Sequence, residues 1–220
     1  MTAEELPAFL DGLDASWAGL SLTMPLKEVV LPLLGSSSEL VRQVAAANTV
    51  LLPARRGENT DVFGIVAALK EAGVRRVSSA VVLGGGATAR SALAALAALG
   101  CRTPTLVVRS DASEALAAAA RLGVTPTVRD WDPDVLVGCE VVVSTVPAGA
   151  ADRMAPYVAD VPVLLDVVYD PWPTALAAGC RGKVVGGATM LLHQAAAQVA
   201  LMTGLEVPVG AMRAVLKQTG

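Results

Sequence analysis

The stretch SSAVVLGGGATARSALAALAALG, from Ser78 to Gly100, decides the fold of the chain. Its first part, Ala80 to Leu83, is a short apolar run of the kind that a buried parallel strand uses. Three glycines follow at once, and the Ala/Leu-rich segment after them predicts a long helix that ends at Gly100. Strand, glycine turn and helix therefore stand in the order that a parallel α/β sheet requires.

The glycine spacing in this stretch is that of a dinucleotide-binding turn. Gly84, Gly86 and Ala89 fit the pattern G-x-G-x-x-G/A. The first glycine allows a tight turn, the second lets backbone approach a pyrophosphate, and the small third residue lets helix and strand pack closely. The N-terminus of the next helix directs N–H groups and partial positive charge at the phosphates. The alternative is a glycine-rich turn without a ligand in an alanine-rich chain.

Composition limits the class of protein. The 220 residues are 54% hydrophobic and 17% charged, with a formal net charge of −3. A large core can therefore be buried, and a broad nucleic-acid surface, which needs clustered Lys and Arg, is disfavoured. The widely spaced Cys101, Cys139 and Cys180 favour buried thiols in a reducing compartment, and the sequence contains no metal-ligand cluster.

Targeting signals are absent from the sequence pattern. Acidic rather than basic residues stand near Met1, unlike a secretory signal. The longest uncharged segment, Val184 to Leu205, contains glycine, histidine and glutamine, which favours a buried helix over a membrane span. We therefore expect a cytoplasmic protein whose partners are neither nucleic acid nor membrane.

The front of the chain carries one lysine that local propensity does not explain. A short helix in EELPAFLDGL and a strand from Leu20 to Thr23 precede a helix for which Thr23 is the expected N-cap. Lys27 stands in the first turn of that helix, where a cation opposes the helix dipole. Both a solvent-exposed lysine and a proton-transferring lysine are consistent with this position.

Three polar residues precede the next helix. After a strand from Thr49 to Leu52 and a turn at PARRGENTD, a helix is predicted from Val62 to Gly73. Asn59, Thr60 and Asp61 stand just ahead of it. Helix capping needs only one of them, so three exceed what capping requires.

The middle of the chain repeats the pattern of strand and helix. Strands are predicted over residues 104–108, 141–144, 163–168 and 183–187, a helix from Ser113 to Leu122, and a polar loop after that helix. Short links between such elements favour a parallel, right-handed sheet. Two further helices are predicted near the C-terminus, one ending at Gly204 and one with Pro208 near its start. His193, the single histidine, is expected to be a helix residue without catalytic work.

Arg109 bears on the choice of cofactor. Arg109 and Ser110 follow the strand of residues 104–108 at its carboxyl end. An acidic residue there would bind ribose hydroxyls, whereas an arginine accommodates a 2′-phosphate. Arg109 therefore favours NADP over NAD. The alternative is a solvent-exposed loop arginine.

Several separated segments resemble one family, the shikimate dehydrogenases. In chain order, SLTMPLKE resembles N-V-T-x-P-x-K, AANTV resembles A-x-N-T, and GENTDVFG resembles N-T-D-x-x-G. VLGGGATAR is similar to V-L-G-A-G-G-A-A-R, VVRS stands where the family has N-R-T, and STVPAG where it has N-T-T-P-x-G. LLDVVYDPWPT is similar to D-x-x-Y-x-P-x-x-T, and GGATMLLHQAAAQ to G-x-x-M-L-x-x-Q. The segments run from about Thr23 to Gly204, and the set is specific.

The resemblance implies an architecture and a set of roles. A Rossmann-like, doubly wound parallel sheet in residues 77–186 would bind NADP, and a smaller α/β substrate domain would combine residues 1–76 and 187–220. Lys27 and Asp61 would be the catalytic acid–base pair. The residues implied to line the site for the substrate are Thr23, Asn48, Tyr169 and Gln194. Those implied for the cofactor are Gly84, Gly86, Ala87 and Thr88 at the pyrophosphate, Arg109 and Ser110 at the adenosine phosphate, and Thr145 near the nicotinamide.

The implied reaction is the reversible, NADP-dependent reduction of 3-dehydroshikimate to shikimate, in the biosynthesis of chorismate and aromatic amino acids. One alternative is a dehydrogenase of quinate or a related polyol acid that uses NAD. Another is a catalytically silent nucleotide-binding module. Ser21, Val108 and Ser144 replace asparagines that the family often has, which weakens individual hydrogen bonds rather than the assignment.

The beginning of the sequence also departs from the family. Family members normally begin with a strand and a loop bearing two serines that grip the substrate carboxylate, and this sequence begins after them. We expect an exposed sheet edge in the smaller domain, and hence a homodimer or an unstable protein unless a partner chain covers that edge.

Overall fold

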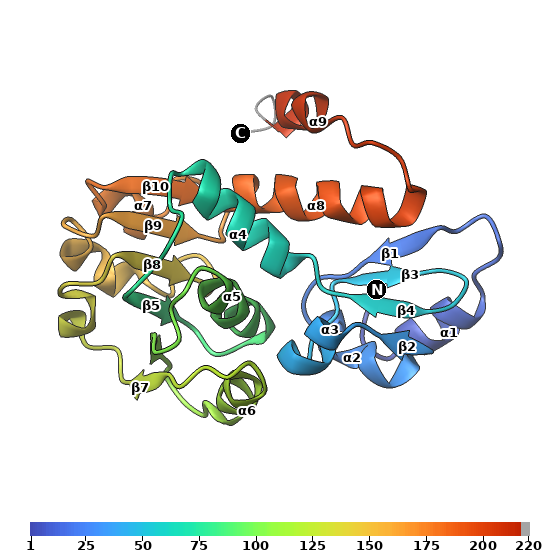
Figure 1. The fold of residues 1–220 in the computed structure, drawn as a ribbon, viewed down its shortest axis with the longest axis horizontal. Helices are drawn as coiled ribbons and strands as arrows, with labels where there is room; N and C mark the ends of the chain where they lie inside the picture. Colours follow the sequence, from blue (N-terminus) through green and yellow to red (C-terminus); the bar gives the residue numbers. More distant parts are fainter. Residues whose placement is uncertain (217–220) are drawn as a thin grey trace.

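The computed structural model describes residues 1–216, which form two sheets with two helices running between them (Figure 1). The larger sheet lies in residues 80–186 and the smaller one in residues 19–58. The part of the expected last helix that falls on residues 217–220 lies outside the described residues.

The larger sheet has six parallel strands in the order β10-β9-β8-β5-β6-β7. Its strands are β5 (Ala80–Leu83), β6 (Thr105–Val107), β7 (Thr127–Arg129), β8 (Val141–Ser144), β9 (Val163–Asp166) and β10 (Lys183–Gly186). The chain winds outward from β5 to β7, returns to β8 beside β5, and winds outward again to β10. This reversal of strand order between β5 and β8 is the doubly wound, Rossmann-like arrangement, and it confirms the predicted fold class.

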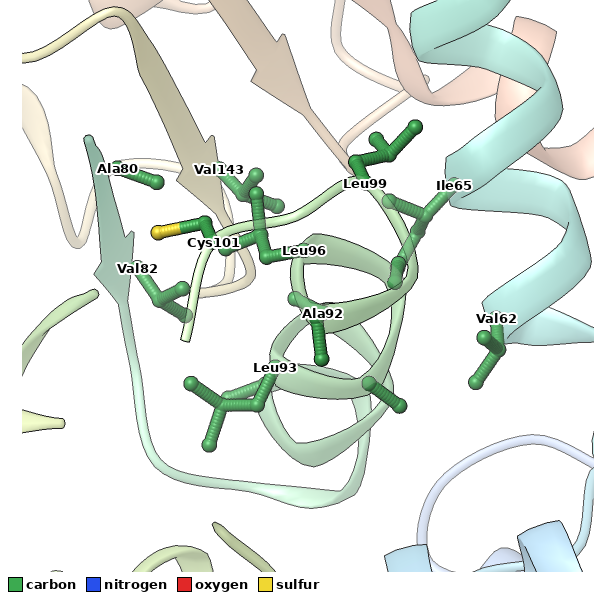
Figure 2. Close-up of a cluster of buried hydrophobic side chains, with 14 of the residues drawn as sticks. Val62, Ile65, Ala80, Val82, Ala92, Leu93, Leu96, Leu99, Cys101 and Val143 are labelled. Atoms are coloured by element: carbon green, nitrogen blue, oxygen red, sulfur yellow. The ribbon is translucent and has the colours of Figure 1, made fainter. Parts of the chain in front are cut away.

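Helices cover both faces of this sheet because successive strand side chains alternate between the faces. Val82 enters the cluster under α4 (Asp61–Glu71), α5 (Ala87–Ala98) and α6 (Ser113–Arg121). Val81 and Leu83 enter the opposite cluster, against η2 (Pro133–Leu136), η3 (Asp152–Tyr157) and α7 (Ala175–Gly179). Figure 2 shows Leu96 of α5 turned toward the sheet, with Ile65 of α4 on the other side of that helix. Burial on both faces explains why β5 is a continuous apolar run.

The smaller sheet has the strand order β1-β3-β4-β2, with β3 antiparallel to both β1 and β4 and with β2 parallel to β4. Its strands are β1 (Gly19–Ser21), β2 (Ser36–Ser37), β3 (Thr49–Leu51) and β4 (Arg56–Glu58). The helices beside it are α1 (Leu6–Asp11), α2 (Leu26–Val29), η1 (Leu31–Leu33) and α3 (Glu39–Val44). Leu6, Val30, Val41 and Val50 form part of its separate core.

Two helices connect the sheets. The helix α4 leads from the smaller sheet to the larger one, and α8 (Gly187–Thr203) returns beside it (Figure 1). A Cβ on Gly64 would lie 2.9 Å from the Met190 carbonyl oxygen and 2.9 Å from Gln194 Cβ, so this glycine permits the close packing of α4 on α8. The last helix, α9 (Val209–Leu216), packs on the outer side of α8.

Some local predictions differ from the structure. Residues 56–58, predicted as part of a turn, form β4, and residues 127–129, predicted as loop, form β7. All three β7 side chains are exposed, so this edge strand lacks the apolar pattern that identifies a strand. The prediction of Thr23 as an N-cap is wrong: α2 begins at Leu26, and only the Thr23 carbonyl oxygen is used there, by the Leu26 N–H at 2.7 Å.

Across residues 1–216, no helix combines the length and the apolar character that crossing a bilayer would demand.

Candidate active site

Lys27 and Asp61 form an ion pair in a cleft between the two sheets. Lys27 Nζ lies 2.6 Å from Asp61 Oδ2, and the exposed fractions of the two side chains are 12% and 4%. Asp61 is the first residue of α4, where the helix dipole favours a carboxylate. Each charge compensates for the loss of water around the other. The ion pair therefore holds the Lys27 amine in a fixed position at the cleft wall.

A buried amide network lies behind this pair. The Asn48 amide nitrogen is 2.9 Å from Asp61 Oδ1, 2.7 Å from Gln194 Oε1 and 2.9 Å from Thr60 Oγ1. An amide group has two hydrogens, so it serves two of these three acceptors at a time. Asn48 Oδ1 accepts from the Thr60 N–H at 2.8 Å. Because Asn48 is only 1% exposed, it lies behind the cleft wall and orients Asp61 and Gln194, whereas the resemblance implied that it lines the site.

The cleft has a volume of about 320 Å³. That is enough for a single-ring small molecule, at the lower end of ligand-pocket sizes. Its walls come from both halves of the molecule: Thr23 follows β1 of the smaller sheet, Thr88 is on α5, Tyr169 is in the loop after β9 of the larger sheet, and Gln194 is on α8. The side chains implied for substrate binding therefore gather here, with Asn48 behind them.

The glycine turn lies where the strand order reverses. Gly84 has φ +113°, and a Cβ there would lie 2.5 Å from Thr145 Oγ1, so only glycine fits. Thr145 in turn donates its hydroxyl to the Leu83 carbonyl oxygen at 2.8 Å. From its position just after β8, Thr145 thus supports the glycine turn that follows β5. The resemblance implied a position beside the nicotinamide, and among the described residues Thr145 is not one that lines the cleft.

The start of α5 suits a pyrophosphate. A Cβ added to Gly86 would meet nothing within 4 Å, so open space lies over the second glycine. No side chain caps the N-terminus of α5, which begins at Ala87 and Thr88. The first N–H groups of the helix and its dipole are therefore available to an anion.

A second pocket, of about 350 Å³, extends from the glycine turn past Arg109 and Ser110. In the described part of the chain, the Arg109 guanidinium has no ion pair. Asp111, by contrast, accepts from the Ser113 Oγ–H at 2.6 Å and from the Ser113 N–H at 2.9 Å, and these hydrogen bonds lower the pKa of Asp111. The acid is thus engaged at the start of α6, while Arg109 is available for a 2′-phosphate. The residues present therefore fit NADP.

Asp166 is a site residue to which sequence reasoning assigned no role. Burial raises the pKa of this carboxyl, which accepts from Thr174 Oγ1 at 2.7 Å and from the Val168 N–H at 3.2 Å. It thereby fixes the loop after β9, on which Tyr169 lines the cleft. Its position could have identified it in the sequence, because Asp166 is the last residue of a strand and the carboxyl ends of the strands face the ligand crevice.

His193 lies away from the cleft. Its Nε2 is 2.8 Å from Glu71 Oε2, and Arg213 donates to both oxygens of that carboxylate, at 2.9 and 2.8 Å. These contacts join α8, α4 and α9. In this structure His193 makes a contact between helices.

The fold and the site together define a class. A dinucleotide turn at the switch point of a doubly wound sheet, facing a cleft with a nearly buried ammonium–carboxylate pair, is typical of a dinucleotide-dependent oxidoreductase. Two family descriptions match the sequence: the shikimate dehydrogenase substrate binding domain over residues 1–50, and the shikimate 5′-dehydrogenase C-terminal domain over residues 187–217.

Individual proteins agree with these matches. The shikimate dehydrogenase (NADP(+)) of Moorella thermoacetica is 34% identical, over 97% of this chain and 79% of that protein. The crystal structure of Mycobacterium tuberculosis shikimate dehydrogenase superposes with a TM-score of 0.91 at 38% identity, covering 99% of this chain and 85% of that one. Quinate dehydrogenase from Corynebacterium glutamicum, in complex with NAD, gives 0.85 at 30% identity, covering 97% and 82%. The chain belongs to the shikimate dehydrogenase family.

Proposed function

We propose that this chain catalyses the reversible, NADP-dependent reduction of 3-dehydroshikimate to shikimate, a step towards chorismate and the aromatic amino acids. One observation carries the proposal. The Lys27–Asp61 pair, with 2.6 Å between its charged atoms, lines the same cleft as Thr88. Thr88 is two residues after Gly86, and the space over Gly86 is open. Acid–base chemistry and cofactor binding would thus take place in two pockets on either side of the first turn of α5.

The residues of the pair divide the work on the substrate. When bound, NADPH supplies the hydride that reduces the carbonyl carbon. Negative charge then develops on the carbonyl oxygen, and the Lys27 ammonium stabilises that charge and donates the proton that completes the hydroxyl. Asp61 holds Lys27 in place and accepts a hydrogen bond from a neighbouring substrate hydroxyl. Acid–base assistance of this kind contributes roughly 10²–10⁴-fold in rate.

Substrate orientation follows from the polar groups around the pair. Thr23, Tyr169 and Gln194 offer a hydroxyl, a phenol and an amide to a polyhydroxylated ring in the cleft. Asn48 sets the direction of the Gln194 amide, because the Asn48 side-chain nitrogen donates to Gln194 Oε1 at 2.7 Å. Polar partners of this kind suit a small hydroxy acid.

The same proposal divides the chain into two domains. Residues 1–76 and 187–220, of which 217–220 lie outside the described residues, would bind the substrate, and residues 77–186 would bind the cofactor. Gly84, Gly86, Ala87 and Thr88 would hold the pyrophosphate, with Arg109 and Ser110 on the adenosine phosphate. Thr145 would act through the shape of the turn. The separate core of the smaller sheet supports this division, and Ile65 and Leu69 of α4 pack in the core of the larger sheet and so join the two domains.

A second candidate is a quinate-type dehydrogenase that uses NAD, since a quinate dehydrogenase in complex with NAD is 30% identical. Arg109, which lines the second pocket without an ion pair in residues 1–216, favours the NADP-linked reaction. The catalytically silent alternative has less support, because such a module has no use for a nearly buried Lys27–Asp61 pair.

Location and assembly complete the proposal. Cys101, Cys139 and Cys180 are free thiols, the first two buried and Cys180 only partly buried, and free thiols suit a reducing compartment such as the cytoplasm. A homodimer is supported by β1, which is an edge strand of the smaller sheet in the described chain. Sedimentation at several concentrations tests the dimer, and a concentration-independent monomer mass would refute it.

The deciding experiment mixes the purified chain with NADP⁺ and shikimate and follows the absorbance of reduced nicotinamide, with quinate and NAD⁺ in parallel. We expect turnover that is fastest with shikimate and NADP⁺. Faster turnover with quinate and NAD⁺ would favour the second candidate. Cofactor binding without turnover of either acid would overturn the enzyme assignment.

A further inference from the structure

Arg90 is a buried cation that lines the second pocket beside the glycine turn and has no role in the proposed chemistry. Its side chain is 2% exposed, and it lies on α5, four residues after Gly86. A guanidinium cannot shed its proton in a protein, so burying one is unfavourable unless its donors are paired. The partners of Arg90 therefore indicate what it holds.

Those partners belong to the smaller sheet and its helices. Arg90 Nε donates to the Val44 carbonyl oxygen at 2.8 Å, and Nη2 donates to the Ala45 carbonyl oxygen at 3.1 Å. Both carbonyls stand at the C-terminus of α3, where unpaired oxygens and the helix dipole favour a cation. Nη2 also pairs with the Glu28 carboxylate, which is next to Lys27 on α2.

The residues that Arg90 holds lead directly to the site. Residues 45–48 join α3 to β3, and together with Val44, the last residue of α3, we name them the 44–48 strap. In this strap, the Ala47 N–H donates to the Lys27 carbonyl oxygen at 2.8 Å. One residue later, Asn48 donates to Asp61 Oδ1 at 2.9 Å. The strap thus fixes the backbone of the lysine and the carboxylate of its partner.

Ser91, the residue after Arg90 on α5, is also linked to the 44–48 strap, through Asn59. Asn59 Nδ2 donates to the Ala46 carbonyl oxygen of the strap at 2.9 Å and to Ser91 Oγ at 3.2 Å. Asn59 Oδ1 accepts from the Val62 N–H at 3.3 Å and so caps α4, the helix that begins with Asp61. Arg90 and Ser91 together link the helix under the glycine turn to the strap.

We propose that Arg90 is a positioning residue. It fixes the 44–48 strap and Glu28 against α5, and it thereby holds Lys27 and Asp61 at the correct position relative to a cofactor bound at the glycine turn. This inference rests on the proposed roles of Lys27 and Asp61. It goes beyond them because Arg90 belongs to the proposed cofactor-binding domain, residues 77–186 (the cofactor half), and contacts neither Lys27 nor Asp61, yet it would set the positions of both.

The chain contains a matched control. Arg121, on α6, donates from Nε to the Gln43 carbonyl oxygen at 2.9 Å, at the surface. Like Arg90, it joins the cofactor half to the C-terminus of α3. Unlike Arg90, it contacts neither the strap nor Glu28 in the described chain. If the two arginines only stabilise the contact between the two halves, replacing either one should have the same effect on kcat.

The test compares Arg90→Met, Arg90→Lys and Arg121→Met in the full chain. Each variant is assayed for kcat and KM with shikimate, for the Kd of NADP⁺ by titration, and for thermal unfolding. We expect Arg90→Met to lower kcat about tenfold, within the range that buried coupling networks produce, while the Kd of NADP⁺ stays near the wild-type value. Arg121→Met keeps wild-type kcat. Arg90→Lys, which keeps the charge but not the planar fork, recovers part of kcat.

Several results would overturn the inference. Wild-type kcat in Arg90→Met would do so, as would an equal loss in Arg121→Met. A loss confined to NADP⁺ affinity would make Arg90 a cofactor-binding residue instead. If Arg90→Met does not fold, Arg90→Lys decides, and wild-type kcat in that variant refutes the inference. Failure of the proposed function is recognised separately, because the wild-type chain itself would then show no turnover.

Discussion

The Asn48 amide nitrogen lies 2.7 Å from the Gln194 side-chain oxygen, although 146 residues separate them in the sequence. Both side chains are buried, and Asn48 also reaches Asp61. The contact therefore ties the front of the chain to α8 at the site itself.

Replacing Asn48 by Leu leaves Asp61 Oδ1 and Gln194 Oε1 without this donor. Each buried polar group left unpaired costs about 1–3 kcal/mol. Since 1 kcal/mol shifts the thermal midpoint of a chain of this size by roughly 2–4 °C, we expect a loss of several degrees and a lower kcat. Calorimetry and the turnover assay measure both. Thr203→Val, on the exposed part of the same helix α8, is the control, and an unchanged midpoint in the Asn48 variant would show that the network adds no stability.

Replacing Lys27 by Met removes the proposed proton donor. We expect kcat to fall by roughly 10²–10⁴-fold, the contribution of acid–base assistance, while NADP⁺ binding is largely spared. Steady-state kinetics and a cofactor titration separate the two effects. Lys70→Met, an exposed position at the other end of α4, should behave like wild type. Wild-type turnover in the Lys27 variant would remove this residue from the mechanism.

Replacing Arg109 by Gln tests the choice of cofactor. Loss of a charge-assisted contact of about 1.5–3 kcal/mol would raise the Kd of NADP⁺ by roughly 10–100-fold. The Kd of NAD⁺, which lacks the 2′-phosphate, should change little. Titrations with both cofactors measure the ratio, with Arg75→Gln as a charge-matched control outside the pocket. Equal weakening of NADP⁺ and NAD⁺ would contradict a contact to the 2′-phosphate.

Gly84 and Gly86 should respond differently to alanine. A Cβ at Gly84 meets Thr145 Oγ1 at 2.5 Å and requires a positive φ, so Gly84→Ala should lower the thermal midpoint. A Cβ at Gly86 meets no atom within 4 Å, so Gly86→Ala should melt like wild type and still bind NADP⁺ more weakly. Melting curves and titrations on both variants decide. Unimpaired NADP⁺ binding by Gly86→Ala would argue against a pyrophosphate at this turn.

Glu71 makes the free energy of unfolding depend on pH. Hydrogen bonds from Arg213, and then from His193, lower the pKa of this carboxyl from its ordinary 4.5. A lowered folded pKa means that the stabilisation is present above pH 4.5 and is lost as the pH falls through the folded value.

We therefore expect Glu71→Gln to reduce the free energy of unfolding near neutral pH, by at most about 1 kcal/mol because the pair is partly exposed. The difference from wild type should disappear in acid. Denaturant titrations across the pH range measure it, with the exposed Glu4→Gln as the control. A difference that persists at the lowest pH would point to packing rather than charge.

The larger sheet was predictable because its central strands are buried on both faces. Ala80–Leu83 and Val141–Ser144 are apolar runs bounded by turn residues, and the structure has them with the predicted bounds. The edge strand β7 was not predictable in this way, since its side chains face solvent and carry no periodic pattern.

The site was predictable only in part, for a physical reason. Lys27 was notable because it opposes a helix dipole, and Asp61 because three polar residues exceed the need for a cap. Arg90 gave no such sign, because two of its three acceptors are backbone carbonyls 45 and 46 residues away, which any residue type supplies, and the third, Glu28, is 62 residues away. Asn48 was found, but whether a side chain faces the cleft or lies behind its wall is fixed by tertiary packing.

The passage of the chain through α4 and back through α8 also sets an order of events during synthesis. All six strands of the larger sheet leave the ribosome before Gln194 does, so that sheet can close while the smaller half is still incomplete. Asn48 is made early and must await a partner that emerges 146 residues later. We therefore expect the cleft beside Gln194 to be among the last parts of a newly made molecule to take its final shape.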